Sequence, residues 1–240
     1  MTQHVLVTRP QGQQHAIMAL LQAAGFHASH QPTLTLSPLP LAAADRTRLL
    51  DLDQYQGVFF VSPNAVRFGV EALRDFWPQW PVDVHWLAVG DATAAALRAE
   101  GLDVISPPTG FNSEAVLELP QLQHVAGWKV LVLCGDGGRM LLTETLRARG
   151  AEVDRVALYQ RDCAKDFKWP PEKLAAALVT SVESWQCLLN HSPDPEMLYV
   201  AGSARIGAAI GAAGFERIAV ADSPHDEDMV ACLIQHLSSP

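Results

Sequence analysis

The chain contains an internal repeat, which constrains its possible folds more than any other feature of the sequence. Residues 5–36 read VLVTRPQGQQHAIMALLQAAGFHASHQPTLTL, and residues 130–160 read VLVLCGDGGRMLLTETLRARGAEVDRVALYQ. Each segment has the pattern of an apolar strand, a polar turn, an amphipathic helix ending in glycine, and a second strand. Further segments match in the same order: 57–73 with 176–189, 86–107 with 198–222, and 112–119 with 226–237. Two similar units in one chain predict two lobes with a binding cleft between them.

Short Val- and Leu-rich runs alternate with helical patterns along the whole chain, for example at 57–62, 129–133 and 198–202. Continuous apolar strands between helices are typical of parallel sheets that helices cover on both faces. The predicted fold class is therefore α/β, with two similar doubly wound parallel-sheet lobes. Ser62 and Ser223 each precede a proline, which predicts a helix N-cap at both positions. Thr180 and Glu183 have the spacing of a capping box.

Charge and cysteine usage limit the classes of partner. The formal net charge is −9, which argues against nucleic acid because phosphate binding needs a basic face. No apolar run approaches the length of a membrane span, and the first residues lack the pattern of a signal peptide. The four cysteines form no CxxC pair, so we expect reduced, mostly buried thiols. These features predict a cytoplasmic protein without a membrane partner, and we expect a monomer because no extra apolar surface stripe is evident.

Familiar cofactor and metal signatures are missing from the sequence. The glycine-rich turn CGDGGRM (134–140) has Met140 where a dinucleotide fingerprint needs its third glycine. No Walker A motif, HExxH spacing or GxSxG elbow occurs. We therefore expect neither a cofactor nor a metal.

A different pattern recurs, in which a strand ends in small hydroxyl or glycine residues that lead directly into a helix. In a parallel sheet such ends share one edge, where free backbone N–H groups and the helix dipole favour anions. For any single hydroxyl, helix capping is the simpler explanation, but matched positions in both lobes favour a binding cleft. Substrate-binding candidates from this pattern and the neighbouring arginines are Thr8, Arg9, Ser62, Asn64, Gly90, Thr93, Arg139, Ser181 and Ser203.

Two kinds of side chain could add chemistry to such a cleft. Arg9, Arg139 and Arg205 follow strand ends and could bind carboxylates as forks, although a solvated arginine explains each equally well. Tyr159 lies in an extended segment that could bridge the lobes, where its phenol could face the cleft. The alternative for Tyr159 is a packed aromatic ring with a hydrogen-bonded hydroxyl.

The whole chain resembles the uroporphyrinogen-III synthase family. The resemblance rests on an ordered set of segments, in which GGR…L…LRARGAEV…V…Y is the strongest part. The other members are VLVTRP (5–10), FFVSPNAV (59–66), LAVGDATAAALRAEG (87–101), FNSEAVLEL (111–119), LVTS (178–181) and VAGSARIGAAI (200–210). The sequence departs from the family at Val61, where threonine is usual, so more weight falls on Ser62 and Asn64. In Gly202-Ser203 the residue that takes the family's serine position is undecided.

The resemblance implies a discontinuous domain organisation. Residues 1–36 plus 163–240 would form one α/β lobe, and residues 37–162 would form an inserted second lobe. A two-stranded antiparallel linker near 33–39 and 156–162 would join them. Periodicity alone would divide the chain near Ala126 instead.

The resemblance also implies an activity without cofactor or metal. The family cyclises hydroxymethylbilane, a linear tetrapyrrole with many carboxylates, with loss of water and inversion of ring D, to give uroporphyrinogen III. Positioning ring D would account for much of the catalysis. Water loss needs a proton donor, and Tyr159 matches the tyrosine usually nominated in the family.

Two rival classes remain open at this point. A non-enzymatic, two-lobed cytosolic binding protein for a polycarboxylate or other small anion would bind product without turnover. A nucleotide-dependent transferase of doubly wound fold would show nucleotide-dependent protection, although the failed GxGxxG pattern counts against it.

Overall fold

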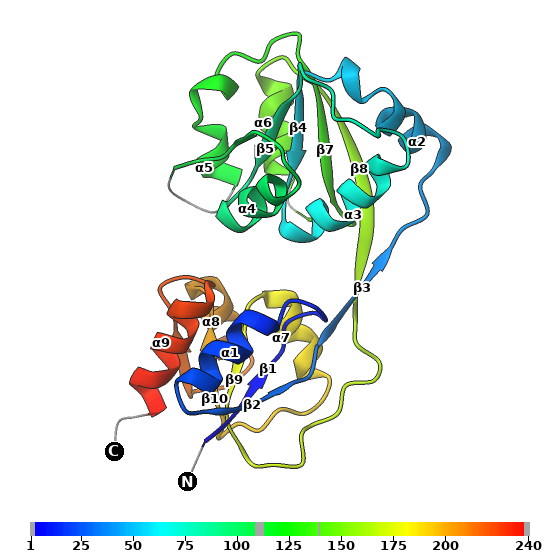
Figure 1. The fold of residues 1–240 in the computed structure, drawn as a ribbon. Helices are drawn as coiled ribbons and strands as arrows, with labels where there is room; N and C mark the ends of the chain where they lie inside the picture. Colours follow the sequence, from blue (N-terminus) through cyan, green and yellow to red (C-terminus); the bar gives the residue numbers. More distant parts are fainter. Residues whose placement is uncertain (1–2, 109–112, 139, 238–240) are drawn as a thin grey trace. The chain divides into compact units, whose positions relative to one another are not determined.

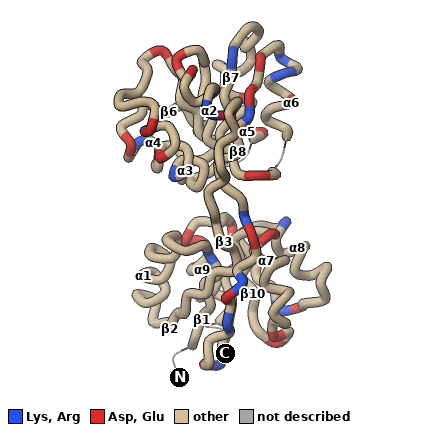
Figure 2. Tube along the Cα trace, turned by 90° about the vertical axis from the view of Figure 1, so that its right-hand side faces the viewer, with Lys and Arg blue, Asp and Glu red and all other residues tan. Residues whose placement is uncertain are grey.

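The structure is a computed structural model that describes residues 3–108, 113–138 and 140–237. The chain divides into two compact units, each with its own sheet (Figure 1). Unit 1 comprises Met1–Leu36 with Asp162–Pro240, and unit 2 comprises Ser37–Arg161. Figure 2 shows acidic and basic residues interspersed along the chain in both units. Among the described residues, no helix is both long and apolar enough to cross a membrane.

Unit 1 is built on a five-stranded sheet in the order β11-β10-β9-β1-β2, with parallel pairing throughout. Its strands are β1 (His4–Val7), β2 (His27–His30), β9 (Leu174–Val179), β10 (Leu198–Ala201) and β11 (Ile218–Val220). Its helices are α1 (His15–Ala23), α7 (Val182–Leu189), α8 (Ala204–Ala212) and α9 (Asp226–Leu237). Alternate residues of β1 face opposite sides. Val5 and Val7 pack with α1 and α9, whereas Leu6 packs with α7 and α8.

Unit 2 is built on a six-stranded sheet in the order β3-β8-β7-β4-β5-β6. The strands are β3 (Leu34–Pro38), β4 (Gly57–Phe60), β5 (His85–Ala88), β6 (Val104–Ile105), β7 (Lys129–Gly135) and β8 (Glu152–Cys163). The helices are α2 (Ala43–Leu50), η1 (Leu52–Gln54), α3 (Pro63–Arg74), α4 (Asp91–Ala99), α5 (Ser113–Leu117), η2 (Pro120–Leu122) and α6 (Leu141–Ala148). Strands β8, β7, β4, β5 and β6 pair in parallel.

The sequence repeat occupies equivalent places in the two sheets, which confirms the predicted fold class. The order β2-β1-β9-β10-β11 in unit 1 corresponds to β8-β7-β4-β5-β6 in unit 2. Each strand of one sheet thus has its sequence counterpart at the same position of the other. Strand β8 has 12 residues where its counterpart β2 has four. The extra length of β8 carries the chain from unit 2 into unit 1.

Strands β3 and β8 form the antiparallel linker. The Leu39 N–H donates to the Leu158 carbonyl at 2.9 Å, and the Ala164 N–H donates to the Thr33 carbonyl at 2.9 Å. Partner numbers fall on β8 as they rise on β3, which defines antiparallel pairing. The chain passes from unit 1 to unit 2 within β3 and returns within β8.

Of the three predicted helix N-caps, the structure confirms Ser62 and contradicts Thr180 and Ser223. Ser62 caps α3, because its hydroxyl accepts a hydrogen bond from the Ala65 N–H at 3.1 Å. The predicted cap at Thr180 is wrong, since Ser181 caps α7 by accepting from the Ser184 N–H at 3.0 Å. Helix α9 begins at Asp226, three residues after the predicted cap Ser223.

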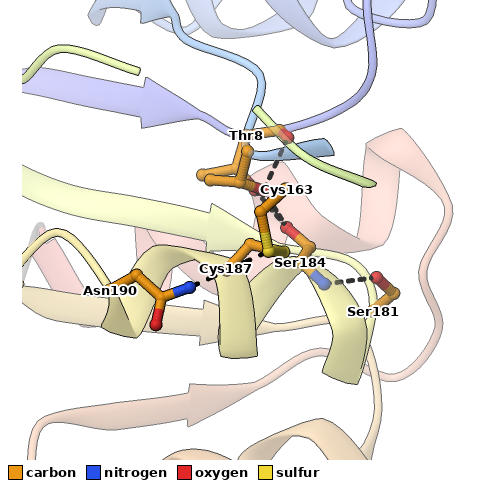
Figure 3. Close-up of a disulfide and its surroundings, with 7 residues drawn as sticks. Thr8, Cys163, Ser181, Ser184, Cys187 and Asn190 are labelled. Carbon is orange, nitrogen blue, oxygen red and sulfur yellow. Dashed lines mark hydrogen bonds between the residues drawn. A yellow bond between two sulfur atoms is a disulfide. The ribbon is translucent and has the colours of Figure 1, made fainter. Parts of the chain in front are cut away.

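The expectation of four reduced cysteines is also wrong. Cys163, at the end of β8, and Cys187, in α7, form a disulfide across a sequence separation of 24 (Figure 3). Only the fold brings their Cα atoms to 5.2 Å, a distance that a disulfide can span. No short motif links the two positions in the sequence. Cys134 and Cys232 are free and buried, as expected.

Candidate active site

A bulge at the carboxyl end of β7 sets the direction of Tyr159. Strands β7 and β8 pair regularly until Cys134 meets Ala157, and the register then shifts so that Gly135 meets Tyr159. Bulges of this kind redirect side chains, because residues on a strand otherwise alternate between its faces. The Tyr159 ring lies directly over Gly135, where an added Cβ would be 2.8 Å from the ring atoms Cε2 and Cζ. Gly135 therefore provides the space through which the ring passes.

The Tyr159 hydroxyl lies 3.0 Å from the Ser62 hydroxyl. Ser62 follows β4, the strand that pairs with β7 on its other side, so Tyr159 reaches across β7 to meet it. The Tyr159 side chain is fully buried, whereas Ser62 is partly exposed. Phe68 of α3 stacks on the Tyr159 ring at 4.9 Å between centroids. The structure thus brings together Tyr159 and Ser62, two of the predicted site residues, through a contact within unit 2.

Arginine side chains lie against these aromatic rings. The Arg67 guanidinium lies over the Phe68 ring at 4.4 Å, and that of Arg161 lies 5.7 Å from the centre of the Tyr159 ring. A ring face favours a cation, and a guanidinium group stacks well on it. Sequence reasoning missed both residues. The only signal was their place beside Phe68 and Tyr159 in the chain.

The glycine-rich turn after β7 is held by Arg155. Its guanidinium donates to the carbonyl oxygens of Gly137 and of Gly135, the latter at 3.4 Å. Gly137 and Gly138 have φ values of +72° and +86°, a backbone region that L side chains rarely adopt. Arg139, the predicted carboxylate ligand in this turn, lies outside the described residues.

Thr8 is part of a buried hydroxyl network in unit 1. Its hydroxyl donates to the Leu178 carbonyl at 2.7 Å and lies 3.2 Å from the Ser184 hydroxyl. The Ser184 hydroxyl in turn lies 2.7 Å from that of Thr33. Figure 3 shows Thr8 and Ser184 close to the disulfide. Thr8 is fully buried, so it can affect a ligand by holding the β1 end in place rather than by contact.

Arg9 forms an ion pair with Asp226 at the start of α9. Its Nη2 atom lies 2.5 Å from the carboxylate and donates to the Pro224 carbonyl at 3.0 Å. Its Nε atom is buried and has no hydrogen-bond partner among the described residues. Arg9 therefore has a buried donor without a partner in that part of the chain, while its charge partner is a protein carboxylate. Burial raises the pKa of Asp226 above its ordinary value, and the positive charge of Arg9 only partly offsets this effect.

The raised pKa of Asp226 predicts a pH-dependent contribution to stability. The folded chain holds the Asp226 proton more tightly than the unfolded chain, so stability is lost as pH rises from the ordinary pKa through the raised one. Replacing Asp226 with asparagine removes this loss. We expect the free energy of unfolding of Asp226→Asn, relative to the wild type, to increase as pH rises above about 4. Denaturant titrations at a series of pH values measure the free energy of unfolding of both proteins. If the two free energies change with pH in parallel, the prediction is contradicted.

The other predicted residues lie at helix starts. Gly90 is the N-cap of α4, and Thr93 is buried within that helix. Asn64 lies partly buried in the first turn of α3, next to the capping Ser62. Ser203 is the N-cap of α8 without a side-chain cap hydrogen bond, so its partly exposed hydroxyl is not committed to the helix. Arg205 lies exposed on the first turn of α8.

Within the described part of the chain, no three His, Cys, Asp or Glu side chains gather in a group that could hold a metal ion. Unit 1 has a cavity of 550 Å³ beside α1 and β2 and another of 280 Å³ beside Trp169 and Ser192. Neither is lined by a predicted site residue.

Comparison with known proteins agrees with this geometry. Residues 15–231 match the family model described as uroporphyrinogen-III synthase HemD. A uroporphyrinogen-III synthase of Salmonella typhimurium is 38% identical over 200 residues, covering 79% of this chain and 80% of the relative. One from Escherichia coli is 31% identical over 246 residues, covering 95% and 99% of the two chains.

Solved structures show the same fold at low sequence identity. A uroporphyrinogen-III synthetase of Helicobacter pylori superimposes with a TM-score of 0.66 at 15% identity, covering 98% of this chain and 99% of the other. A mutant uroporphyrinogen III synthase of Thermus thermophilus gives a TM-score of 0.62 at 19% identity, covering 99% of both chains.

Proposed function

Because this chain belongs to the uroporphyrinogen-III synthase family, we propose that it cyclises hydroxymethylbilane to uroporphyrinogen III. The reaction loses water and inverts ring D, which makes the protein a lyase of tetrapyrrole and haem biosynthesis. The structural observation that carries the proposal is the Ser62–Tyr159 hydroxyl pair at the carboxyl edge of the unit 2 sheet. Loss of water needs a proton donor, and this pair supplies one at the N-terminus of a helix.

The substrate's carboxylates are bound by strand-end residues and arginines. In unit 2 we assign this role to Asn64, the Gly90 backbone, Arg67, Arg139 and Arg161. In unit 1 we assign it to Arg9, Ser181 and Ser203. Helix N-termini and guanidinium forks favour carboxylates, which offsets the long-range repulsion from a chain of net charge −9. Thr8 and Thr93 are buried, so they hold the backbone of this edge in position.

Positioning accounts for the direction of ring closure. Simple closure without inversion competes in solution, so the protein must hold ring D where attack at the substituted carbon is favoured. The reaction has no net redox change, and proton transfer with positioning suffices to explain it. We further propose that the protein is a monomer that acts in the cytoplasm, and this location rests on its role in haem biosynthesis, because the Cys163–Cys187 disulfide removes the argument from reduced cysteines. Size-exclusion chromatography with light scattering tests the oligomeric state.

The decisive experiment is an isomer analysis. Freshly made hydroxymethylbilane is incubated with the protein, the products are oxidised to porphyrins, and uroporphyrins I and III are separated. We expect isomer III to predominate. Isomer I alone, formed at the spontaneous rate, would overturn the enzymatic proposal, and binding of the product without turnover would then identify an anion-binding protein.

A further inference from the structure

We propose that Ser62 is the hydroxyl that contacts the departing oxygen of the substrate, and that Tyr159 acts through Ser62 as a positioning and proton-supplying residue. This inference rests on the proposed function and assigns separate roles within its hydroxyl pair. It changes the role of Tyr159, which the family resemblance nominates as the proton donor.

The two hydroxyl groups differ in how far they are buried. Tyr159 has an exposed fraction of 0%, since its ring is enclosed by Phe68 on one element and by the Gly135 backbone on another. Ser62 is partly exposed, and its hydroxyl lies 3.0 Å from that of Tyr159. A ligand at this edge can therefore touch Ser62 while the phenol stays covered.

The available hydrogen-bond partners indicate that the Tyr159 hydroxyl donates its proton to the Ser62 oxygen. A buried phenol must donate its proton to an acceptor, because an unmet buried donor is costly. Within the described part of the chain, the recorded partner of the Tyr159 hydroxyl is the Ser62 hydroxyl. The Ser62 oxygen also accepts from the Ala65 N–H at 3.1 Å. A serine hydroxyl has two acceptor positions and one proton. Both acceptor positions are thus filled, and the Ser62 proton is left to be donated outward.

The surroundings of Ser62 favour this donation. Ser62 caps α3, a helix of 12 residues, so its oxygen lies at the positive end of the helix dipole. Negative charge that develops on the Ser62 oxygen as its proton leaves is stabilised there. Donors that are already fixed in place need no rearrangement when that charge appears. Tyr159 is fixed by stacking on Phe68 and by passing over Gly135.

Loss of water and ring closure together leave the number of protons on the protein unchanged. The C–O bond of the substrate's hydroxymethyl group breaks, and its electron pair stays on the departing oxygen. The Ser62 proton passes to that oxygen to form water, and the Tyr159 proton passes to the Ser62 oxygen. Inversion of ring D then forms a C–C bond from the former hydroxymethyl carbon to the substituted carbon of ring D and breaks the C–C bond between that carbon and its bridging methylene. The freed methylene forms a C–C bond to the unsubstituted α-carbon of ring D, which releases one proton. That proton passes to the Ser62 oxygen while Ser62 returns a proton to the Tyr159 oxygen, so the protein is unchanged after each turnover.

A double-mutant cycle tests the assignment with the isomer III assay. We expect Ser62→Gly to lower kcat about 100-fold and Tyr159→Phe to lower it about 10-fold, within the usual range for general acid catalysis or below it. If Tyr159 acts through Ser62, then Tyr159→Phe in the Ser62→Gly background causes no further loss of kcat. If Tyr159→Phe lowers kcat in the Ser62→Gly background by the same factor as it does in the wild type, the assignment is overturned. A Ser62→Gly protein with wild-type kcat also overturns it.

Matched variants separate catalysis from folding. Glycine replaces serine at an N-cap with little loss of helix stability, so Ser62→Gly is expected to fold. Ser62→Thr keeps both the cap and the hydroxyl and is expected to restore kcat to within a few-fold of wild type, whereas a kcat as low as that of Ser62→Gly would count against the assignment. Tyr199→Phe removes another buried phenol, which donates to the Asp194 carbonyl in unit 1, and is expected to leave kcat unchanged.

The wild-type protein distinguishes this assignment from the function itself. A wild type that makes only isomer I overturns the proposed function and the assignment with it. A wild type that makes isomer III, together with multiplicative losses in the cycle, overturns only the assignment of Ser62 as the contacting hydroxyl.

Discussion

Replacing Gly135 with alanine is expected to lower the rate of isomer III formation about 10-fold, the loss expected for Tyr159→Phe, because both substitutions remove the Tyr159 hydroxyl from Ser62. The added Cβ would lie 2.8 Å from two ring atoms of Tyr159 and 3.1 Å from its hydroxyl oxygen. Real Cβ contacts do not occur at such distances, so the ring must move. It cannot move freely, because it is fully buried and stacked on Phe68. The 3.0 Å contact with Ser62 is therefore lost.

The same substitution is expected to destabilise the fold by about 1–3 kcal/mol, the usual cost of overpacking a core. Gly211→Ala is the matched control, because Gly211 lies in α8 and its added Cβ would meet Ile218 at an ordinary 3.6 Å. Alanine in a helix is favoured over glycine by roughly 0.5–1 kcal/mol, so the control is expected to be more stable and fully active. The rate of isomer III formation and the free energy of unfolding in denaturant are measured for both Gly135→Ala and Gly211→Ala. A Gly135→Ala protein with wild-type activity would contradict the role of the Tyr159 position.

Reducing the Cys163–Cys187 disulfide is expected to lower the free energy of unfolding by about 3.5 kcal/mol, the loop entropy for a separation of 24 residues. The disulfide joins the end of β8, where the chain re-enters unit 1, to α7 of the same unit. Without it, the unfolded chain gains conformational freedom that the folded chain does not. Denaturant unfolding with and without a thiol reductant measures the change.

The double variant Cys163→Ser/Cys187→Ser provides the control for that experiment. Reductant is expected to leave its unfolding midpoint unchanged, since Cys134 and Cys232 are not paired. Thiol titration of the denatured wild type is expected to find two free cysteines before reduction and four afterwards. An unfolding midpoint of the wild type that reductant does not change would argue against a stabilising disulfide.

Part of the candidate site can be predicted from the sequence, because it depends on interactions between residues that are close together in the chain. A hydroxyl before proline predicts a helix cap, and Ser62 has that role in the structure. Its partner Tyr159 is predicted from its place in the extended bridging segment and, as a proton donor, from the family resemblance. Their contact could not be predicted, because it depends on a one-residue register shift between β7 and β8. The arginines that lie on the rings escaped notice for a similar reason, since Arg67 lies on an exposed helix position with no motif of its own.

The sequence by itself determined the repeated α/β pattern, the positions of the strands and the start of α3 at Ser62, because these depend on residues close together in the chain. The equivalent strand orders of the two sheets follow from that repeat. Tertiary structure alone decided the Cys163–Cys187 pairing, the Arg9–Asp226 ion pair and the path of the Tyr159 ring over Gly135. Each of these joins residues that are distant in the sequence, and each depends on packing geometry of an ångström or less. A sequence pattern carries no information at that precision.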